Sequence, residues 1–303
     1  VTSEYLNTTD ITVTLPQRIK NKYAYLAIFN ELEWKPITGA EIKGKEVRFK
    51  TLGKDIVYMP VYYDKYEIMQ PLTWPFIIYS DGTTKHLQIR KDSTMSIKMS
   101  RKYPESCGHE YWYRNLAGAR IEASNDPDFK KVDTVYINTK RLNFRYEYIH
   151  LDTTLQKRYW RITSPNRWGI LLADLHFYDN HLQEIKGKIM NIDSIRGAAL
   201  WDDDPLTNAS ISWAGMDFGQ ATQVSQIRLL PHNDANGIYP GYEYELFYYD
   251  FPKGWVSLGI KNSEDNEVVY NNVPAGTLYW LRNLTTGKEE RIFTWEDGQA
   301  RFW

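Results

Sequence analysis

Short apolar runs, each about the length of a β-strand, constrain the fold of this chain more than any other feature of its sequence. In the first hundred residues these runs are 11–15, 23–29, 46–49, 56–59 and 95–99. Turn-forming pairs such as Asp81-Gly82 lie between them, and Pro60, Pro71 and Pro75 disfavour helix in the intervening segments. The pattern predicts an all-β protein that begins with a β-sandwich of the Ig-like or prealbumin-like type.

The length of 303 residues is enough for two or three domains. We expect tandem β-sandwiches: an N-terminal sandwich, then a partial module, then a fuller module. Their expected bounds are 1–103, 104–188 and 189–303. The one stretch that permits helix, 181–200, is interpreted as a connector or a short helix between β regions.

The same sequence pattern occurs in each of the two later regions. The matched segments are 120–129 with 242–255, 158–162 with 278–282, and 173–178 with 290–295. Three matched elements in the same order indicate a repeat. The middle region matches only the later half of such a module. It is therefore either a degenerate copy or a region that borrows strands from a neighbour.

Charge and hydropathy exclude two classes of partner. The chain has 37 basic and 38 acidic residues and a net charge of -1, so it lacks the basic excess of an electrostatic nucleic-acid binder. No apolar run approaches the roughly 20 residues that a membrane helix needs, so we expect no membrane insertion by this segment. The single cysteine excludes an intrachain disulfide and a zinc site built from several thiolates.

Aromatic residues make up 15% of the chain, with 23 Tyr and 11 Trp. Aromatic side chains suit half-buried pleated surfaces, and they also form stacking platforms for sugars. Trp160, Trp255 and Trp280 lie in strand-like runs or directly after a turn, so we assign them to core or inter-sheet packing.

Candidate catalytic residues are few. Cys107 and His109 would share one face of a strand, but no glycine-flanked nucleophile turn or third member accompanies them. The run 202–204 also fits the metal-nucleotide motif of glycosyltransferases, which requires an α/β fold that the strand pattern does not predict. We therefore expect no catalytic residues in this chain, and any catalytic domain is expected upstream of Val1.

The last region resembles the discoidin, or coagulation-factor type C, family of galactose-binding-like jelly rolls. The resemblance rests on the acidic loop 199–207, Trp213, the segment 217–219, the strand and loop 224–232, and the segment 236–249. It covers about residues 190–303 and implies that the later modules are jelly rolls. The phrases 53–60 and 282–291 further resemble the C-terminal part of secreted, discoidin-containing transglutaminase-like proteins of Bacteroidetes. That resemblance implies an extracytoplasmic location (secreted, periplasmic or outer cell surface) and upstream domains in the same polypeptide.

The resemblance also implies a structural calcium ion in the acidic loop, and no other cofactor is required. The positions carried over are Asp202, Asp204 and Thr207, because calcium takes carboxylate, carbonyl and hydroxyl oxygens. The family's usual glycine between the two aspartates is Asp203 here, and aspartate tolerates a positive φ better than most residues. The alternative is a solvated acidic turn ahead of Pro205.

Glycan binding in this family uses loops at one end of the sandwich. Polar groups there bind sugar hydroxyls while an aromatic ring stacks on the apolar face of the sugar. The candidate ligand-binding residues are His232, Asn233, Asp234, Asn236, Trp213 and Tyr239. Carbohydrate-binding relatives often carry arginine where this chain has His232, and neutral histidine offers one donor and one acceptor instead of a fork of donors. This departure weakens the expectation of galactose specificity.

These observations lead to three functional hypotheses. The first is a non-catalytic, extracytoplasmic binding region of a larger bacterial surface or secreted protein, with glycan or glycoprotein as its partner. The second is a structural spacer that positions an upstream transglutaminase-like catalytic domain and has no ligand of its own. The third, ranked last, is an enzyme in its own right.

Overall fold

The computed structural model describes residues 8–104, 116–140, 142, 144–167, 169–190, 197–287 and 290–303. Within these ranges the regular structure is antiparallel β-sheet plus one turn of 3₁₀ helix, η2 (Gly197–Leu200). The all-β expectation is therefore confirmed, and the sheets include a curled half-barrel. In the same ranges, no helix is long and apolar enough to cross a lipid bilayer.

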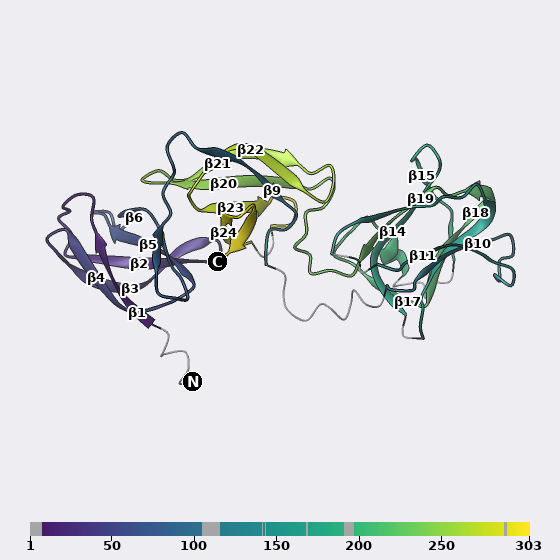
Figure 1. Ribbon diagram of the computed structural model, residues 1–303, viewed down its shortest axis with the longest axis horizontal. Coiled ribbons are helices and arrows are strands. Elements are labelled where there is room, and N and C mark those ends of the chain that lie inside the picture. The colour runs from purple at the N-terminus through teal and green to yellow at the C-terminus, as the bar shows by residue number, and fades with distance from the viewer. Residues whose placement is uncertain are drawn as a thin grey trace. The chain divides into compact units, whose positions relative to one another are not determined.

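The chain divides into two compact units, which Figure 1 shows. One unit combines Val1–Pro104 with Pro240–Trp303, and the other is Glu105–Tyr239. The second unit is thus inserted into the sequence of the first. This division differs from the three consecutive segments that we expected from the sequence.

The N-terminal part of the first unit is an eight-stranded sheet in the order β1-β4-β3-β2-β5-β7-β8, with β6 paired to β5. Its strands are β1 (Thr8–Thr14), β2 (Tyr23–Asn30), β3 (Glu33–Lys43), β4 (Glu46–Gly53), β5 (Ile56–Tyr63), β6 (Met69–Pro71), β7 (Phe76–Ile78) and β8 (Thr84–His86). Pro60 lies within β5, where β7 pairs up to Tyr58 and β6 pairs from Val61. Pro60 itself pairs with Leu26 of β2, and its carbonyl accepts the Leu72 N–H at 2.8 Å, so the missing proline N–H falls where the partner on that edge changes from β7 to β6.

The C-terminal part of the first unit is a sheet in the order β21-β20-β23-β24-β25, and β22 pairs with β9. These strands are β9 (Thr94–Met99), β20 (Glu243–Asp250), β21 (Gly254–Asn262), β22 (Val268–Pro274), β23 (Tyr279–Asn283), β24 (Ile292–Glu296) and β25 (Gln299–Phe302). Ala27 and Val57 share one buried cluster with Leu278, Trp280 and Ile292. Both ends of the chain therefore contribute to a common core, and Trp280 packs in it as predicted.

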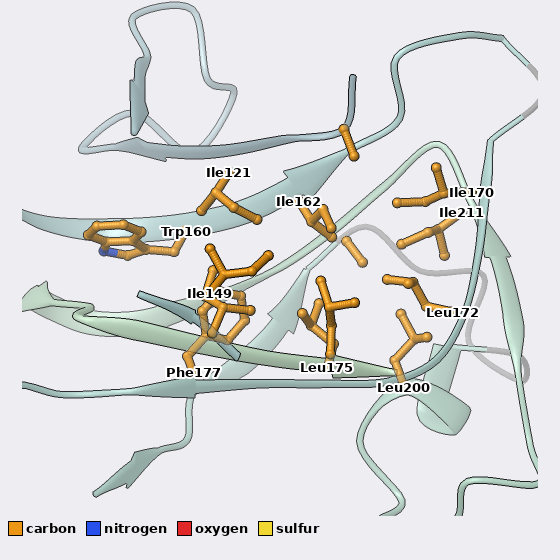
Figure 2. Close-up of a cluster of buried hydrophobic side chains, with 14 of the residues drawn as sticks. Ile121, Ile149, Trp160, Ile162, Ile170, Leu172, Leu175, Phe177, Leu200 and Ile211 are labelled. Atoms are coloured by element: carbon orange, nitrogen blue, oxygen red, sulfur yellow. The ribbon is translucent and has the colours of Figure 1, made fainter. Parts of the chain in front are cut away.

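The second unit consists of two layers. One sheet has the order β11-β10-β13-β18-β16, and the other has the order β12-β19-β14-β15 with β17 on β14. The strands are β10 (Arg120–Ser124), β11 (Asp133–Ile137), β12 (Glu147–His150), β13 (Gln156–Thr163), β14 (Ile170–Tyr178), β15 (Glu184–Ile185), β16 (Lys188–Met190), β17 (Ala209–Ile211), β18 (Trp213–Gln223) and β19 (Gln226–Pro231). Figure 2 shows Ile121 and Trp160 of the first layer above Leu175 and Phe177 of the second. Trp160 is fully buried, which confirms its predicted place in the core.

The middle region builds these layers with strands from the region that follows it. β18 and β19 lie beyond residue 189, yet they pair with β13 and β14. Ala214 and Met216 of β18 are buried in the same cluster as Trp160 and Ile162 of β13. Of the two alternatives that the sequence left open, the structure therefore favours borrowed strands.

The predicted repeat is visible in part of the strand pairing. β10 pairs with β11 and β13, just as β20 pairs with β21 and β23. The third matched element differs, because β24 pairs with β23 whereas β14 pairs with β19 in the other layer. In the described part of the stretch 181–200, which is 181–190 and 197–200, the structure has β15, β16 and one turn of 3₁₀ helix, η2.

Candidate functional site

The outer face of the β12-β19-β14-β15 sheet carries polar side chains, because apolar and polar residues alternate along the end of β14. Leu175 and Phe177 point into the core, so Asp174 and His176 face the opposite side. A β-bulge follows Leu172: the register moves from Leu172–Pro231 to Asp174–Leu230, which sets two residues of β14 against one of β19. The bulge turns Asp174 outward although Leu172 and Leu175 both point inward.

The predicted ligand loop follows β19 and is held by its own hydrogen bonds. The Asn233 amide donates to the carbonyls of Pro205 and Pro231, each at 3.1 Å. Its Oδ1 accepts the Ala235 N–H and the Tyr239 hydroxyl, each at 2.8 Å. Asn233 thus ties this loop to the acidic loop that contains Pro205.

The other candidate residues of this loop differ in exposure. His232 and Asp234 are half-buried, whereas Asn236 is buried and donates its backbone N–H to Asp234 Oδ1 at 3.2 Å. Tyr239 is 1% exposed, and its ring meets Tyr146 edge-on at 6.4 Å. Tyr239 therefore supports the loop from below, and its ring is covered.

Trp213 belongs to a different cluster. It begins β18 on the outer face of the other layer, because its neighbour Ala214 points into the core. The guanidinium of Arg161 lies 4.0 Å from the ring centre of Phe129 and 5.2 Å from that of Trp213, and it donates to Glu122. The structure thus brings Trp213 to an arginine–aromatic stack, while the other five ligand candidates lie on the 232–239 segment.

The predicted metal residues do come together. Thr207 Oγ1 lies 3.1 and 2.9 Å from the two carboxylate oxygens of Asp202, 3.1 Å from the carbonyl of Asp204 and 3.3 Å from the carbonyl of Ala199. A hydroxyl has one proton, so it can donate to one of these four oxygens at a time. The loop therefore gathers hard oxygen atoms beyond what one hydroxyl can satisfy. The side chain of Asp204 is engaged elsewhere, since its Oδ1 accepts the Leu206 N–H at 2.9 Å.

Between these residues, Asp203 has a positive φ of 57°, at the position where the family that the chain resembles usually has glycine. Its carboxylate reaches His176 Nε2 at 3.4 Å and Arg228 Nη2 at 3.5 Å. Glycine at this position would supply the turn but not these two contacts. The acidic loop is thereby connected to a buried polar group on β14.

That buried group centres on His176, which is 1% exposed. Its Nε2 lies 2.6 Å from Asp174 Oδ1 and its Nδ1 lies 2.9 Å from Glu184 Oε1. Asp174 is fully buried and also accepts the hydroxyl of Tyr146 at 2.8 Å. Sequence reasoning did not single out these residues; the available signal was the Asp174-Leu175-His176 alternation within an otherwise apolar strand.

The electrostatics of the group favour a charged imidazole. Burial alone would lower the pKa of His176, but the hydrogen bonds and charges of Asp174 and Glu184 outweigh it and raise that pKa. Burial, followed by the charge of Asp174, raises the pKa of Tyr146 far above its ordinary value, so this hydroxyl stays protonated. Arg228 lies 3.5 Å from Asp174 and stacks 4.8 Å from the ring centre of Tyr146.

Asp174, His176 and Asp203 could hold a metal ion, since one ligand atom of each lies within 4.8 Å of the others. An imidazole nitrogen with two carboxylates suits a metal such as zinc better than calcium, which takes oxygen ligands. Glu184 would then orient the imidazole through Nδ1, as carboxylates behind metal-binding histidines commonly do. The guanidinium of Arg228 competes with a cation for the same two aspartates.

Together the fold and this group define an all-β, multi-sheet protein with a polar cluster on one sheet face. A comparison with protein-family models finds no match, and a comparison with curated protein sequences finds none either. The candidate pair Cys107 and His109 lies outside the described residues. The assignment to the discoidin family thus remains a resemblance.

Proposed function

We propose that this chain is a non-catalytic, extracytoplasmic binding region of a larger protein and recognises glycan or glycoprotein. One observation carries the proposal. Loops from three parts of the second unit meet beside β19: the acidic loop, the ligand loop and the segment before β12. Asn233 bonds the first two together, and Tyr146 and Tyr239 are in ring contact between the last two. Converging loops held by buried side chains are a common way to build a binding surface on a rigid scaffold.

A bound calcium ion is the second part of the proposal. The oxygens of Asp202, Asp204 and Ala199 around the Thr207 hydroxyl are the ligand type that calcium prefers. When bound, calcium would hold these oxygens together by coordination, and the Thr207 hydroxyl would offer it a lone pair while keeping its proton. Because Pro205 of this loop accepts the Asn233 amide, the ordering of the acidic loop would extend to the ligand loop. We therefore expect chelation to weaken glycan binding.

The spacer hypothesis is the second candidate, and a specific observation favours it. Asn233 uses its amide and carbonyl groups in hydrogen bonds within the protein, and Asn236 and Tyr239 are buried. Such a loop could simply close the end of the unit. In that case His232 and Asp234 would be the remaining half-exposed candidates of the 232–239 segment, and the chain would bind no sugar.

A glycan-array screen of the full chain, with calcium and with EGTA, separates the two candidates. His232→Ala is the test variant, and His181→Ala is the matched control because His181 is an exposed histidine in another loop of the same unit. The proposal expects reproducible binding to a sugar class, weakened by EGTA and by His232→Ala but unchanged in the control. A folded sample that binds no glycan in either buffer would favour the spacer.

A further inference from the structure

The first unit contains an open, polar depression of about 660 Å³, and none of its lining residues was singled out for ligand binding by the sequence. It is formed where the turn between β7 and β8 meets the β24–β25 hairpin. The hairpin turn is Asp297-Gly298, and both residues have positive φ, as a two-residue turn of this kind requires. The volume lies within the range of roughly 300–1,000 Å³ that is typical of small-molecule sites.

Hydrogen bonds and ring contacts connect the side chains on the floor of the depression. Glu296 Oε1 accepts the Tyr79 hydroxyl at 3.1 Å and the Lys85 ammonium at 3.2 Å. Burial would raise the pKa of Glu296, but Lys85 and Tyr79 outweigh that effect and lower it, so Glu296 is ionised at neutral pH. The guanidinium of Arg301 packs against two rings that contact each other, 5.0 Å from the centre of Tyr79 and 4.4 Å from that of Trp303. A ligand would thus meet side chains that are already fixed, which lowers the entropy cost of binding.

Two side chains in the depression are available for a ligand. Trp295 is half-buried, and in the part of the chain that the structure describes no other aromatic ring packs against it. Arg90 is exposed, and no described carboxylate lies within ion-pair distance of its guanidinium. Both residues also line a smaller adjoining cavity of about 70 Å³ beside Gly276, which extends the depression. Gly276 leaves room for Arg90, because a Cβ there would lie 2.9 Å from the Arg90 Cγ.

The charge of the depression indicates the class of ligand. Its charged lining residues are Lys85, Arg90, Arg301, Asp81, Glu296 and Asp297. These are three cations and three anions, so their formal charges cancel. A balanced site does not select an anion or a cation, whereas its many donors and acceptors suit hydroxyl groups. An indole face beside such groups is a stacking platform for the apolar side of a sugar ring.

From these observations, and resting on the proposed function of glycan binding, we propose that this depression is a binding site for an uncharged saccharide. Trp295 stacks on the sugar ring. Arg90 binds its hydroxyls, while Glu296 holds Tyr79 and Lys85 in place. The adjoining cavity accommodates part of a second sugar residue. The site is separate from the loop that contains His232, so the chain would carry two places for glycan.

The test uses the full chain on an array of neutral and acidic glycans, followed by calorimetric titration of the strongest neutral oligosaccharide. Trp295→Ala and Arg90→Ala are the test variants, and the exposed Arg90 keeps the test valid if Trp295→Ala fails to fold. Tyr66→Ala is the matched control, because Tyr66 is an aromatic residue of the same unit that is 69% exposed and outside the depression. We expect at least a tenfold loss of affinity in each test variant and none in the control.

Three results would overturn this assignment in distinguishable ways. Affinity within twofold of the wild-type value in Arg90→Ala and in a folded Trp295→Ala would exclude the depression. If His232→Ala then abolished binding, the proposed function would stand and the site would be the ligand loop. Binding restricted to acidic glycans would refute the uncharged class. An absence of any glycan binding by folded wild-type chain would remove the proposed function and this site with it.

Discussion

Replacement of His176 by leucine tests whether the buried polar group holds the second unit together. The change removes the imidazole that lies 2.6 Å from Asp174 and 2.9 Å from Glu184. Glu184 is 30% exposed and can be solvated, but Asp174 is fully buried and would lose one of its partners. Removal of one member of a buried ion pair costs about 3–5 kcal/mol. Asp174 keeps the Tyr146 hydroxyl and the nearby guanidinium of Arg228, so we expect a loss of about 3 kcal/mol, at the low end of that range.

The same variant should also change the pH dependence of stability. Because the pKa of His176 is raised in the folded chain, protonation favours folding. This contribution is fully present below the ordinary histidine pKa of 6.5 and is lost as the pH rises through the higher folded pKa. Wild-type stability should therefore decline above pH 6.5 by an amount that the leucine variant does not show.

Urea denaturation of the full chain, followed by hydrogen exchange of peptides from β14 and β19, reports the second unit separately from the first. Measurements in EDTA keep any metal from contributing. His181→Leu is the control, because His181 is exposed in the adjoining turn. The reasoning is refuted if His176→Leu unfolds at the wild-type urea midpoint, or if both chains show the same slope of stability with pH above 6.5.

Two further predictions concern the outer face of the β11-β10-β13-β18-β16 sheet of the second unit. Arg161→Lys keeps the charge beside Glu122 but loses the planar guanidinium over Phe129. We therefore expect thermal denaturation to show a destabilisation of about 1–2 kcal/mol. An unchanged melting midpoint would contradict a role for the arginine–aromatic stack. Gly215→Ala would place a Cβ 2.1 Å from the carbonyl oxygen of Trp160, so we expect a loss of about 1–3 kcal/mol from forced movement of β13 against β18. Equal chemical-denaturation midpoints for this variant and the wild type would show that the strands can separate without cost.

The local features of the fold could be predicted from sequence because they depend on neighbours in the chain. Strands β2, β4, β5 and β9 fall on the expected apolar runs. The positive φ of Asp203 agrees with its place between two turn-forming aspartates. Trp160 is buried as its strand-like surroundings indicated.

The pairing of distant segments could not be predicted in this way. Nothing in 94–99 specifies that its partner is 268–274, because an apolar strand pairs equally well with many others. The same ambiguity hid the pairing of β18 with β13, and with it the observed division into units.

The buried polar group escaped prediction for a related reason. His176 and Asp174 are adjacent on one strand face, but Glu184, Asp203 and Arg228 come from three other segments. The bulge that turns Asp174 outward is also a property of the pairing with β19 rather than of the local sequence. By contrast, the oxygens around Thr207 come from one short loop, and the family resemblance implied that these residues act together.

The insertion of one unit into the sequence of the other has a consequence for biosynthesis. All strands of the second unit are available for pairing once β19 has emerged from the ribosome. β9 cannot pair at that stage, because its partner β22 is synthesised later. The first unit therefore remains incompletely folded while the inserted second unit folds. Early folding of the inserted part shortens the effective loop that β9 and β22 must close and so lowers its entropic cost. A nascent chain arrested once residue 239 has emerged from the ribosome, but before β22 has emerged, should expose unpaired β9 to chaperones while protecting β14 from protease.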